Sequence, residues 1–267
     1  MPTTMTPEFL RLRRSVRNFT DKPLDAESVK TLKAEITMIN THEAGMYFEL
    51  VTDDASPFEG FKASYGMFRG VRNYIAVVAE TSYPDALERA GYFAEHIVMK
   101  AVSLGIGTCF VGGTFAADRA KVNLRAGRKL LFLIALGYAA TRSQTLLSGM
   151  AIKFAHRHDR PYQDFYVPAE GYSLEKASSQ LPWLVNGLKG VACAPSSLNK
   201  QPVRIRPKLQ GAPGSAGRLT VTASVEDEGG NNLIDLGIAK YNFAKAAGGV
   251  WEWGNGASFY PAGTEQS

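Results

Sequence analysis

Residues 194–202 read Ala-Pro-Ser-Ser-Leu-Asn-Lys-Gln-Pro, and this stretch is the most informative part of the sequence. Two prolines enclose hydroxyl and amide side chains, so a loop here would present several directed hydrogen-bond donors and acceptors. Such a set suits a flat heterocycle with ring carbonyls and nitrogens. Proline, serine and asparagine also favour ordinary polar turns, so the stretch by itself leaves both interpretations open.

A second cluster, Arg-Arg-Ser-Val-Arg at residues 13–17, carries three guanidinium groups and one hydroxyl. Arginine donates charge-assisted and often bidentate hydrogen bonds to phosphate. The pattern predicts a short helix over residues 6–17, on which Arg13 and Arg17 would share one face. A phosphate site and a solvated basic helix face are both compatible with this cluster.

Length and composition indicate an ordinary globular protein. The chain has 267 residues, of which 45% are hydrophobic and 21% are charged, so most of it should not be disordered. The longest apolar run, residues 130–140, is shorter than the roughly 20 residues of a membrane helix. The first ten residues lack the apolar segment of a secretory signal. We therefore expect no membrane partner.

Charge and cysteine content restrict the ligands. The net charge of +5 suits an anionic ligand, but the basic residues do not form the single stripe of a nucleic-acid binder. Two cysteines exclude a disulfide framework and a multi-cysteine zinc site, and they favour a reducing, cytoplasmic location. His156 and His158 have no acidic or cysteine partner at ligand spacing, so no metal site is expected.

Hydrophobic periodicity predicts helices and strands along most of the chain. Helices are expected at residues 26–39, after an Asp25 N-cap, and at 85–104, 173–190 and 234–247. Strands are expected at residues 47–51, 73–79, 130–138, 203–207 and 218–225. An apolar segment, residues 108–113, ends in Gly112 and Gly113. The tail from Gly254 is glycine-rich and is expected to be loose.

The order helix, strand, strand, helix, strand occurs early and recurs more weakly later. Both long helices carry a glycine followed by small apolar residues, at Gly91 and Gly237. We interpret this as an internal duplication, although two alanine-rich helices can also resemble each other by chance. The predicted organisation is a first half at residues 6–148, a connector at 149–172 and a second half at 173–260.

Together the two clusters resemble the nitroreductase family of flavoenzymes. That family has Arg-Arg-Ser-x-Arg followed by Phe and Pro, here residues 13–17, Phe19 and Pro23. It also has a loop of the form Ala-Pro-Ser-x-x-Asn-x-Gln-Pro, here residues 194–202. Weaker similarities lie at residues 136–139, 160–165, 235–237 and Asn242. The resemblance covers most of residues 8–250.

The resemblance implies an α+β, nitroreductase-like three-layer fold with two pseudo-symmetric halves fused in one chain, a pseudo-dimer. Ordinary members are homodimers in which the arginine segment of one subunit meets the serine loop of the other around the flavin. In those members the loop follows the arginine segment closely, whereas here residues 35–45 lack it and the loop occurs only in the second half. The chain therefore resembles an asymmetric fusion with one flavin site, for which a monomer is possible.

The family's cofactor contacts carry over onto matching positions. The FMN phosphate would be held by Arg13, Ser15 and Arg17, with Arg14 alongside and Arg160 as a weaker candidate. The isoalloxazine or ribityl chain would contact Pro195, Ser196, Ser197 and Asn199. Gly112 and Gly113 match the place where the family presents backbone N–H groups near the flavin N5, although a plain turn after a strand is the alternative.

The implied activity is FMN-dependent reduction of small, flat, electron-poor substrates, such as nitroaromatics or quinones, with NAD(P)H as co-substrate and a ping-pong mechanism. No side chain is assigned a catalytic acid–base role. The absence of a Gly-x-Gly-x-x-Gly fingerprint argues against a Rossmann NAD domain. The alternative function is a non-enzymatic flavin-binding protein, and a weaker one is a basic module for anionic polymers.

Overall fold

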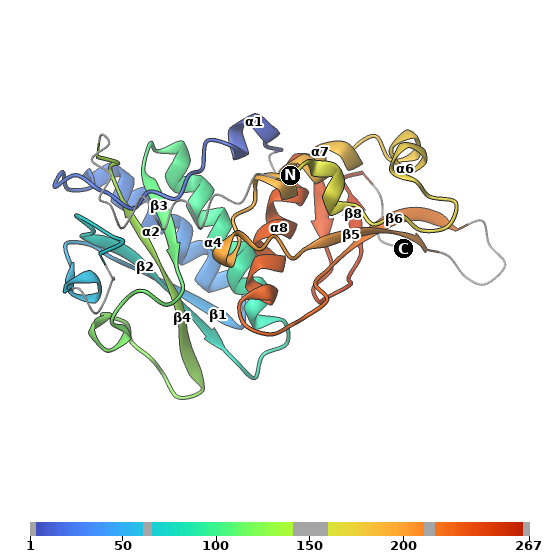
Figure 1. Cartoon of the computed structure of the whole chain (residues 1–267). Helices are drawn as coiled ribbons and strands as arrows, with labels where there is room; N and C mark the ends of the chain where they lie inside the picture. Colours follow the sequence, from blue (N-terminus) through green and yellow to red (C-terminus); the bar gives the residue numbers. More distant parts are fainter. Residues whose placement is uncertain (1–3, 61–65, 141–159, 211–216, 264–267) are drawn as a thin grey trace. The chain divides into compact units, whose positions relative to one another are not determined.

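The computed structural model describes residues 4–60, 66–140, 160–210 and 217–263, and the chain divides into two compact units (Figure 1). The first unit is Leu12–Arg157. The second unit consists of Met1–Arg11 and His158–Ser267. The predicted end of the first half, at residue 148, lies outside the described residues.

An antiparallel sheet forms the centre of the first unit. Its strand order is β1-β2-β4-β3, and the strands are β1 (Met46–Val51), β2 (Asn73–Glu80), β4 (Arg128–Gly137) and β3 (Gly107–Val111). From Asn73 to Ala79 every residue of β2 is buried, as expected of a central strand covered on both faces. The strands predicted at residues 47–51, 73–79 and 130–138 are confirmed, with shifts of a few residues at their ends.

Two helices and a set of loops cover this sheet. Helices α2 (Ala26–His42) and α4 (Ala86–Ser103) pack against each other and against β1. The predicted N-cap of α2 is confirmed, because the Asp25 carboxylate accepts a 2.8 Å hydrogen bond from the Ser28 N–H. Apolar side chains from the sheet pack with loop residues into a further cluster: Phe19, Phe58, Phe68, Val71, Tyr74, Ala76, Cys109, Val111, Leu133 and Ala135.

The second unit contains two β-hairpins and a pair of packed helices. One hairpin pairs β5 (Arg204–Gln210) with β6 (Arg218–Ser224), and the other pairs β7 (Gly249–Trp251) with β8 (Phe259–Pro261). Helix α7 (Leu184–Cys193) packs on α8 (Asn232–Ala247). The short helices are α1 (Pro7–Leu10) and α6 (Leu174–Gln180). The predicted strands at 203–207 and 218–225 and the helix at 234–247 are confirmed.

The two units repeat one order of elements. The first unit runs α2-β1-β2-α4-β3-β4, and the second runs α7-β5-β6-α8-β7-β8. In the second unit an isolated antiparallel bridge joins Thr222 of β6 to Ser258 beside β8. This bridge gives the neighbour order β5-β6-β8-β7, which matches β1-β2-β4-β3. The expected fold of two halves with the same topology is therefore observed.

Three sequence-based expectations about secondary structure are wrong. The helix predicted over 6–17 contains only Pro7–Leu10 as α-helix. The helix predicted over 173–190 is two helices, because Pro182 lacks the N–H that a continuous helix needs. The tail predicted to be loose from Gly254 contains β8, in which Phe259 is fully buried.

Aromatic packing explains the order of this tail. The ring of Phe259 lies 4.8 Å from that of Trp183 and 5.0 Å from those of Phe243 and Trp251, measured between centroids. Burying such rings is strongly favourable and also aligns them edge to face. The glycines that suggest a loose tail are therefore outweighed by one anchored aromatic residue.

Replacing Gly190 by Ala should destabilise the second unit. A Cβ at Gly190 would lie 2.5 Å from the Asn242 carbonyl oxygen, so α7 and α8 would have to separate. Overpacking of this kind costs about 1–3 kcal/mol, more than the roughly 1 kcal/mol that alanine adds to helix propensity. We expect a lower urea midpoint, with Asn186→Ala on the exposed side of α7 as the control. Tryptophan fluorescence is the measurement, since Trp183, Trp251 and Trp253 all lie in this unit. An unchanged midpoint would show that the helices can adjust.

Candidate functional site

The segment at residues 13–19 pairs with the edge strand β3 at Ser15 and then leaves it. Ser15 forms a parallel bridge with Thr108, and the Val16 N–H donates a 2.8 Å hydrogen bond to the Thr108 carbonyl. Phe19 then pairs with Ala139 after the end of β4. The predicted helical placement of Arg13 and Arg17 is therefore wrong, because the open edge of β3 offers these backbone groups hydrogen-bond partners.

The extended backbone still gathers the predicted phosphate ligands. In an extended chain alternate side chains lie on the same side, so Arg13, Ser15 and Arg17 share one side and Arg14 lies on the other. The surroundings of the Cys109 thiol also indicate that Arg13, Ser15 and Arg17 lie near one another. Burial raises the pKa of Cys109, while the charges of Arg17 and Arg13 and a hydrogen bond with Ser15 oppose that rise. The arginine segment is thus a local concentration of positive charge beside β3.

Arg13 and Arg17 differ in their ion pairing. The Arg13 Nε lies 4.0 Å from a carboxylate oxygen of Glu95 on α4, and the Glu95 side chain is fully buried. Arg17 forms no ion pair within the described ranges of the chain. Glu95 was not singled out from the sequence, although an acidic residue within an apolar helix face was a usable signal.

Gly112 and Gly113 follow the other end of β3. Both are exposed, and a Cβ added to Gly113 would meet no atom within 4 Å. The arginine segment and the glycine pair therefore flank the same strand, with Thr108 near its beginning and Val111 at its end. Both predicted groups therefore lie in the first unit, beside opposite ends of one strand.

The loop at residues 194–202 lies in the second unit, directly after α7. Its backbone is unusual, because Leu198, Asn199 and Gln201 have φ angles of 52°, 52° and 50°. Such left-handed conformations are uncommon outside glycine and cost folding free energy. Other hydrogen bonds compensate within the loop: the Gln201 N–H donates to the Ser196 hydroxyl over 2.8 Å.

This loop is held by Asp235 of α8 and by Asn231, the N-cap of α8. The Ser197 N–H donates to both carboxylate oxygens of Asp235, over 3.0 and 3.1 Å. The Asn231 side-chain amide donates to the Ser197 hydroxyl over 3.2 Å. Burial raises the pKa of Asp235 to about 7. In the sequence, Asp235 stands out only for its similarity to the family. An acid in the first turn of an otherwise apolar helix was the signal that could have identified its contact with the loop.

Arg160 lies in the second unit near the far end of the same loop. The Arg204 guanidinium donates to the carbonyls of Gln201 and Val203, over 2.9 and 2.8 Å. Burial lowers the pKa of Arg204, and the nearby charge of Arg160 lowers it further. Arg160 therefore lies close to Arg204, which contacts the loop. The sequence did not predict this neighbourhood.

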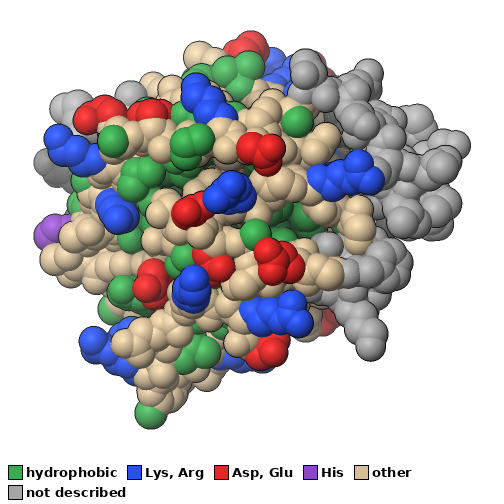
Figure 2. All heavy atoms as spheres, turned by 90° about the vertical axis from the view of Figure 1, so that its left-hand side faces the viewer, with side chains coloured by type: hydrophobic (Ala, Val, Ile, Leu, Met, Phe, Trp, Pro, Cys, Tyr) green, Lys and Arg blue, Asp and Glu red, His purple; other side chains and the backbone are tan. Residues whose placement is uncertain are grey.

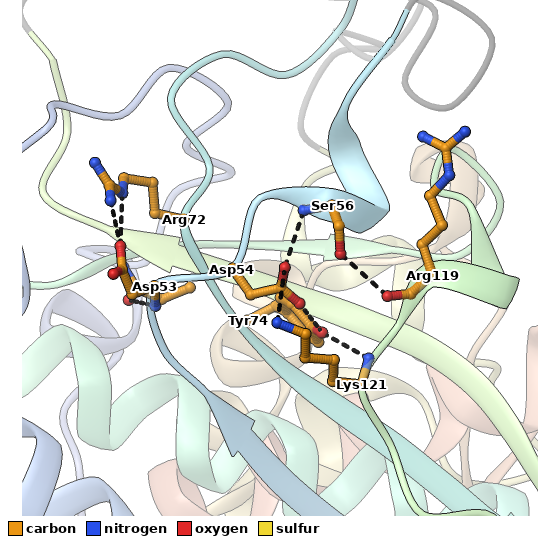
Figure 3. Close-up of polar contacts among 8 residues, drawn as sticks. Asp53, Asp54, Ser56, Arg72, Tyr74, Arg119 and Lys121 are labelled. Carbon is orange, nitrogen blue, oxygen red and sulfur yellow. Dashed lines mark hydrogen bonds and ion pairs between the residues drawn. The ribbon is translucent and has the colours of Figure 1, made fainter.

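The first unit contains a hollow, and several of its lining residues make the polar contacts drawn in Figure 3. It has a volume of about 440 Å³ and is lined by Asp53, Asp54, Ala55, Ser56, Glu59 and Arg72. The buried Asp54 carboxylate accepts hydrogen bonds from the Tyr74 hydroxyl (2.8 Å) and the Ser56 N–H (3.2 Å). The Tyr74 hydroxyl in turn accepts from the Lys121 N–H over 2.9 Å. These contacts tie two loops to β2, and none of the predicted ligand residues lies in this hollow.

The distribution of charges and of possible metal ligands limits the classes of ligand further. On the face drawn in Figure 2, acidic and basic side chains are interspersed among the coloured residues. Within the described part of the chain, no cluster of three or more His, Cys, Asp or Glu side chains could hold a metal ion. His156 and His158 lie outside the described residues. None of the helices in the described ranges is long and apolar enough to cross a membrane.

One of the solved structures that resemble the chain shares its fold along nearly the whole length. A protein described as a putative nitroreductase from Thermotoga maritima is similar over 96% of this chain and 93% of its own, with 21% identity and a TM-score of 0.57. An FMN-dependent nitroreductase from Clostridium difficile R20291 matches 51% of this chain and 89% of its own, with 17% identity and a TM-score of 0.40. None of the curated proteins compared with the chain matches it.

A family model covers nearly the whole sequence. The model described as "Putative TM nitroreductase" matches residues 6–247, a range that includes the arginine segment, the glycine pair and the loop at 194–202. With the repeated α+β topology and the grouping of Arg13, Ser15 and Arg17 beside β3, this match assigns the chain to an oxidoreductase family. The protein belongs to the nitroreductase family.

Proposed function

We propose that the protein binds FMN and uses NAD(P)H to reduce small, flat, electron-poor substrates such as nitroaromatics or quinones. The observation that carries this proposal is the arrangement on β3. Positive charge gathers where Ser15 pairs with Thr108, and exposed backbone follows at Gly112 and Gly113. At roughly 3.3 Å per residue, about 13 Å of strand separate Thr108 from Gly112. A phosphate and a ring joined by a ribityl chain can occupy two such separated sites.

The donors beside β3 fit a phosphate monoester. Arg17 forms no ion pair with the residues that the structure describes, so its guanidinium can donate charge-assisted hydrogen bonds to a ligand. Arg13 is partly neutralised by Glu95, and Ser15 adds a hydroxyl. Arg14 is proposed alongside them, with a smaller contribution because it lies on the other side of the segment.

The remaining proposed contacts concern the ring and the ribityl chain. Gly113 has open space where a side chain would lie, so its backbone and that of Gly112 can approach a flat ring closely. We also propose that Pro195, Ser196, Ser197 and Asn199 contact the isoalloxazine or ribityl chain. Arg160 is proposed as an additional phosphate contact.

When bound, FMN would supply the hydride and electron transfer, which no side chain can provide. The chain's own groups would hold the phosphate, orient the ring through backbone N–H groups and leave one face open beside Gly112 and Gly113. Donor and acceptor are both flat and would use the same face, so we propose that they bind alternately in a ping-pong mechanism.

Spectra and initial rates test this function together. We expect purified protein to carry a flavin absorbance band that NADPH or NADH bleaches under anaerobic conditions. Initial rates at several NADPH and nitroaromatic or quinone concentrations should then give parallel double-reciprocal lines. A band that neither nicotinamide bleaches would instead support a non-enzymatic flavin-binding protein. Converging lines would contradict alternate binding, and colourless protein that does not take up FMN would contradict the proposal as a whole.

One FMN should bind per chain. The Arg-Arg-Ser segment at 13–17 and the Pro-Ser-Ser loop at 195–197 each occur once in the sequence. In the first unit the corresponding connection between α2 and β1 is only Glu43, Ala44 and Gly45. Flavin released by heat would be measured against protein concentration, with a size-exclusion profile to test for the proposed monomer. A ratio near two flavins per chain would require a second site and would contradict the asymmetric fusion.

A further inference from the structure

Asp235 occupies a position that a globular core does not favour. It is 4% exposed and lies in the first turn of α8, whose residues from Ile234 to Ala244 are all buried. A carboxyl group loses hydration there, which is unfavourable unless other groups compensate. The compensation comes from the loop, since the Ser197 N–H reaches both carboxylate oxygens.

The loop that Asp235 contacts requires external support. Leu198 and Gln201, which are neither glycine nor asparagine, hold φ angles near +50°. Leu198 is also 77% exposed, so its own side chain gains little from packing. Strained residues persist where surrounding contacts determine their conformation. The contacts from Asp235 and Asn231 to Ser197 lie at the start of the strained residues.

The first unit has different chemistry at the corresponding place. Arg89 and Asp235 each lie three residues after the first residue of their helices, α4 and α8. Arg89 forms an ion pair of 3.3 Å with Glu43, which directly follows α2. In the first unit the residue at this helix position, Arg89, therefore contacts a short connection. In the second unit the equivalent residue, Asp235, contacts a long loop, residues 194–203. The acid Asp235 thus occupies this helix position in the unit that has the long loop, and the base Arg89 occupies it in the unit that lacks the loop.

We infer that Asp235 is a positioning residue that holds the loop at 194–202 in the conformation that binds the flavin ring. This inference rests on the proposed function. Asp235 itself would not touch the flavin. It would act through the Ser197 N–H, fixing the backbone so that the Ser196, Ser197 and Asn199 side chains are presented in one arrangement before the ligand arrives. Such preorganisation raises affinity because less order is lost on binding.

Flavin titrations of the apoprotein test this role. Asp235→Leu keeps a buried side chain of similar size but removes both acceptors, and it should weaken the binding of FMN and of riboflavin equally, by tenfold or more. Asp235→Asn keeps one acceptor oxygen and should remain within about threefold of the wild type. Asp227→Leu is the matched control, because Asp227 is an exposed acid that precedes α8 and accepts from the Gly229 N–H and the Asn232 side-chain amide rather than from the loop at 194–202. It should bind flavin normally.

Hydrogen exchange adds a readout that does not depend on flavin. Peptides covering residues 194–203 should exchange faster in Asp235→Leu, while those from α7 should not change. If the leucine variant does not fold, Asp235→Ala decides, since it removes the same two acceptors and should weaken the binding of both flavins by tenfold or more. Unchanged flavin affinity in Asp235→Leu, or in that second variant, would overturn the role of Asp235. Wild-type protein that binds neither flavin would overturn the proposed function instead.

Discussion

Replacing Arg17 by Ala should lower the proposed affinity for FMN by about tenfold to a hundredfold and leave the affinity for riboflavin unchanged. A charge-assisted hydrogen bond contributes roughly 1.5–3 kcal/mol, and each 1.4 kcal/mol is about tenfold in Kd. Riboflavin lacks the phosphate, so it does not use this contact. Arg17 has no ion-pair partner among the described residues, so its removal leaves none of the acidic groups in those residues unpaired. Quenching of flavin fluorescence during titration measures both constants.

Arg11→Ala is the control for this experiment, because Arg11 is an exposed arginine close by that is not among the proposed ligands. It should bind both flavins as the wild type does. Arg14→Ala should fall between the two variants, since residue 14 lies on the opposite side of the extended segment. Equal losses for FMN and riboflavin in Arg17→Ala would mean that Arg17 supports the fold rather than the phosphate.

The arginine segment shows where local sequence reasoning fails. Arginine is a good helix former, and residues 13–17 contain no glycine or proline that would end a helix. The outcome depends instead on β3, which lies far along the chain and leaves an edge that pairs with Ser15 through Thr108. Tertiary pairing outweighs a propensity of a few tenths of a kcal/mol per residue. The choice of Arg13, Ser15 and Arg17 as phosphate ligands stays a prediction, and it does not depend on a helix, because alternate positions also share a side in an extended chain.

Elements with strong patterns are predicted well for a physical reason. The run at 73–79 is apolar at nearly every position, and only a strand covered on both faces buries all of it. The helix around Gly91 carries an apolar stripe that buries Ala90, Ala94 and Ile97. In both cases the apolar residues whose burial stabilises the element lie close together in the sequence. The repeated topology of the two units follows from such segments, whereas the family resemblance was drawn from the two motifs at residues 13–17 and 194–202.

The conformation of the loop at 194–202 could not be predicted in the same way. Asparagine at 199 is a known signal for a positive φ, but leucine at 198 and glutamine at 201 are not. Their conformation depends on a contact between Ser197 and Asp235, which lie on different elements of the chain. A motif can thus identify the residue types that a ligand needs, while the anchoring of those residues becomes visible only when distant segments are placed together.

Asp235 makes the second unit less stable as the pH rises from about 4 to about 7. Burial raises the pKa of Asp235 from 3.8 to about 7, against the opposing effects of the Ser197 N–H and the charge of Lys200. Between these values the unfolded chain has released the proton that the folded unit keeps. The free energy of unfolding then falls by about 1.4 kcal/mol per pH unit, or roughly 4 kcal/mol over the whole window. Below it both states are protonated and above it both are ionised, so the slope vanishes.

Asp235→Asn isolates this effect, because the amide keeps an acceptor oxygen for the Ser197 N–H but does not titrate. The other ionisable groups are common to both proteins, so their contributions cancel in the difference. Urea unfolding followed by tryptophan fluorescence reports this unit alone, since all three tryptophans lie in it. From pH 5 to pH 7 the asparagine variant should gain stability relative to the wild type by about 1.4 kcal/mol per pH unit, and the difference should stay constant above pH 8. Parallel stability curves across this range would mean that the carboxyl group is hydrated rather than buried. The hold of Asp235 on the loop would then have to be weaker than its two hydrogen bonds with the Ser197 N–H indicate.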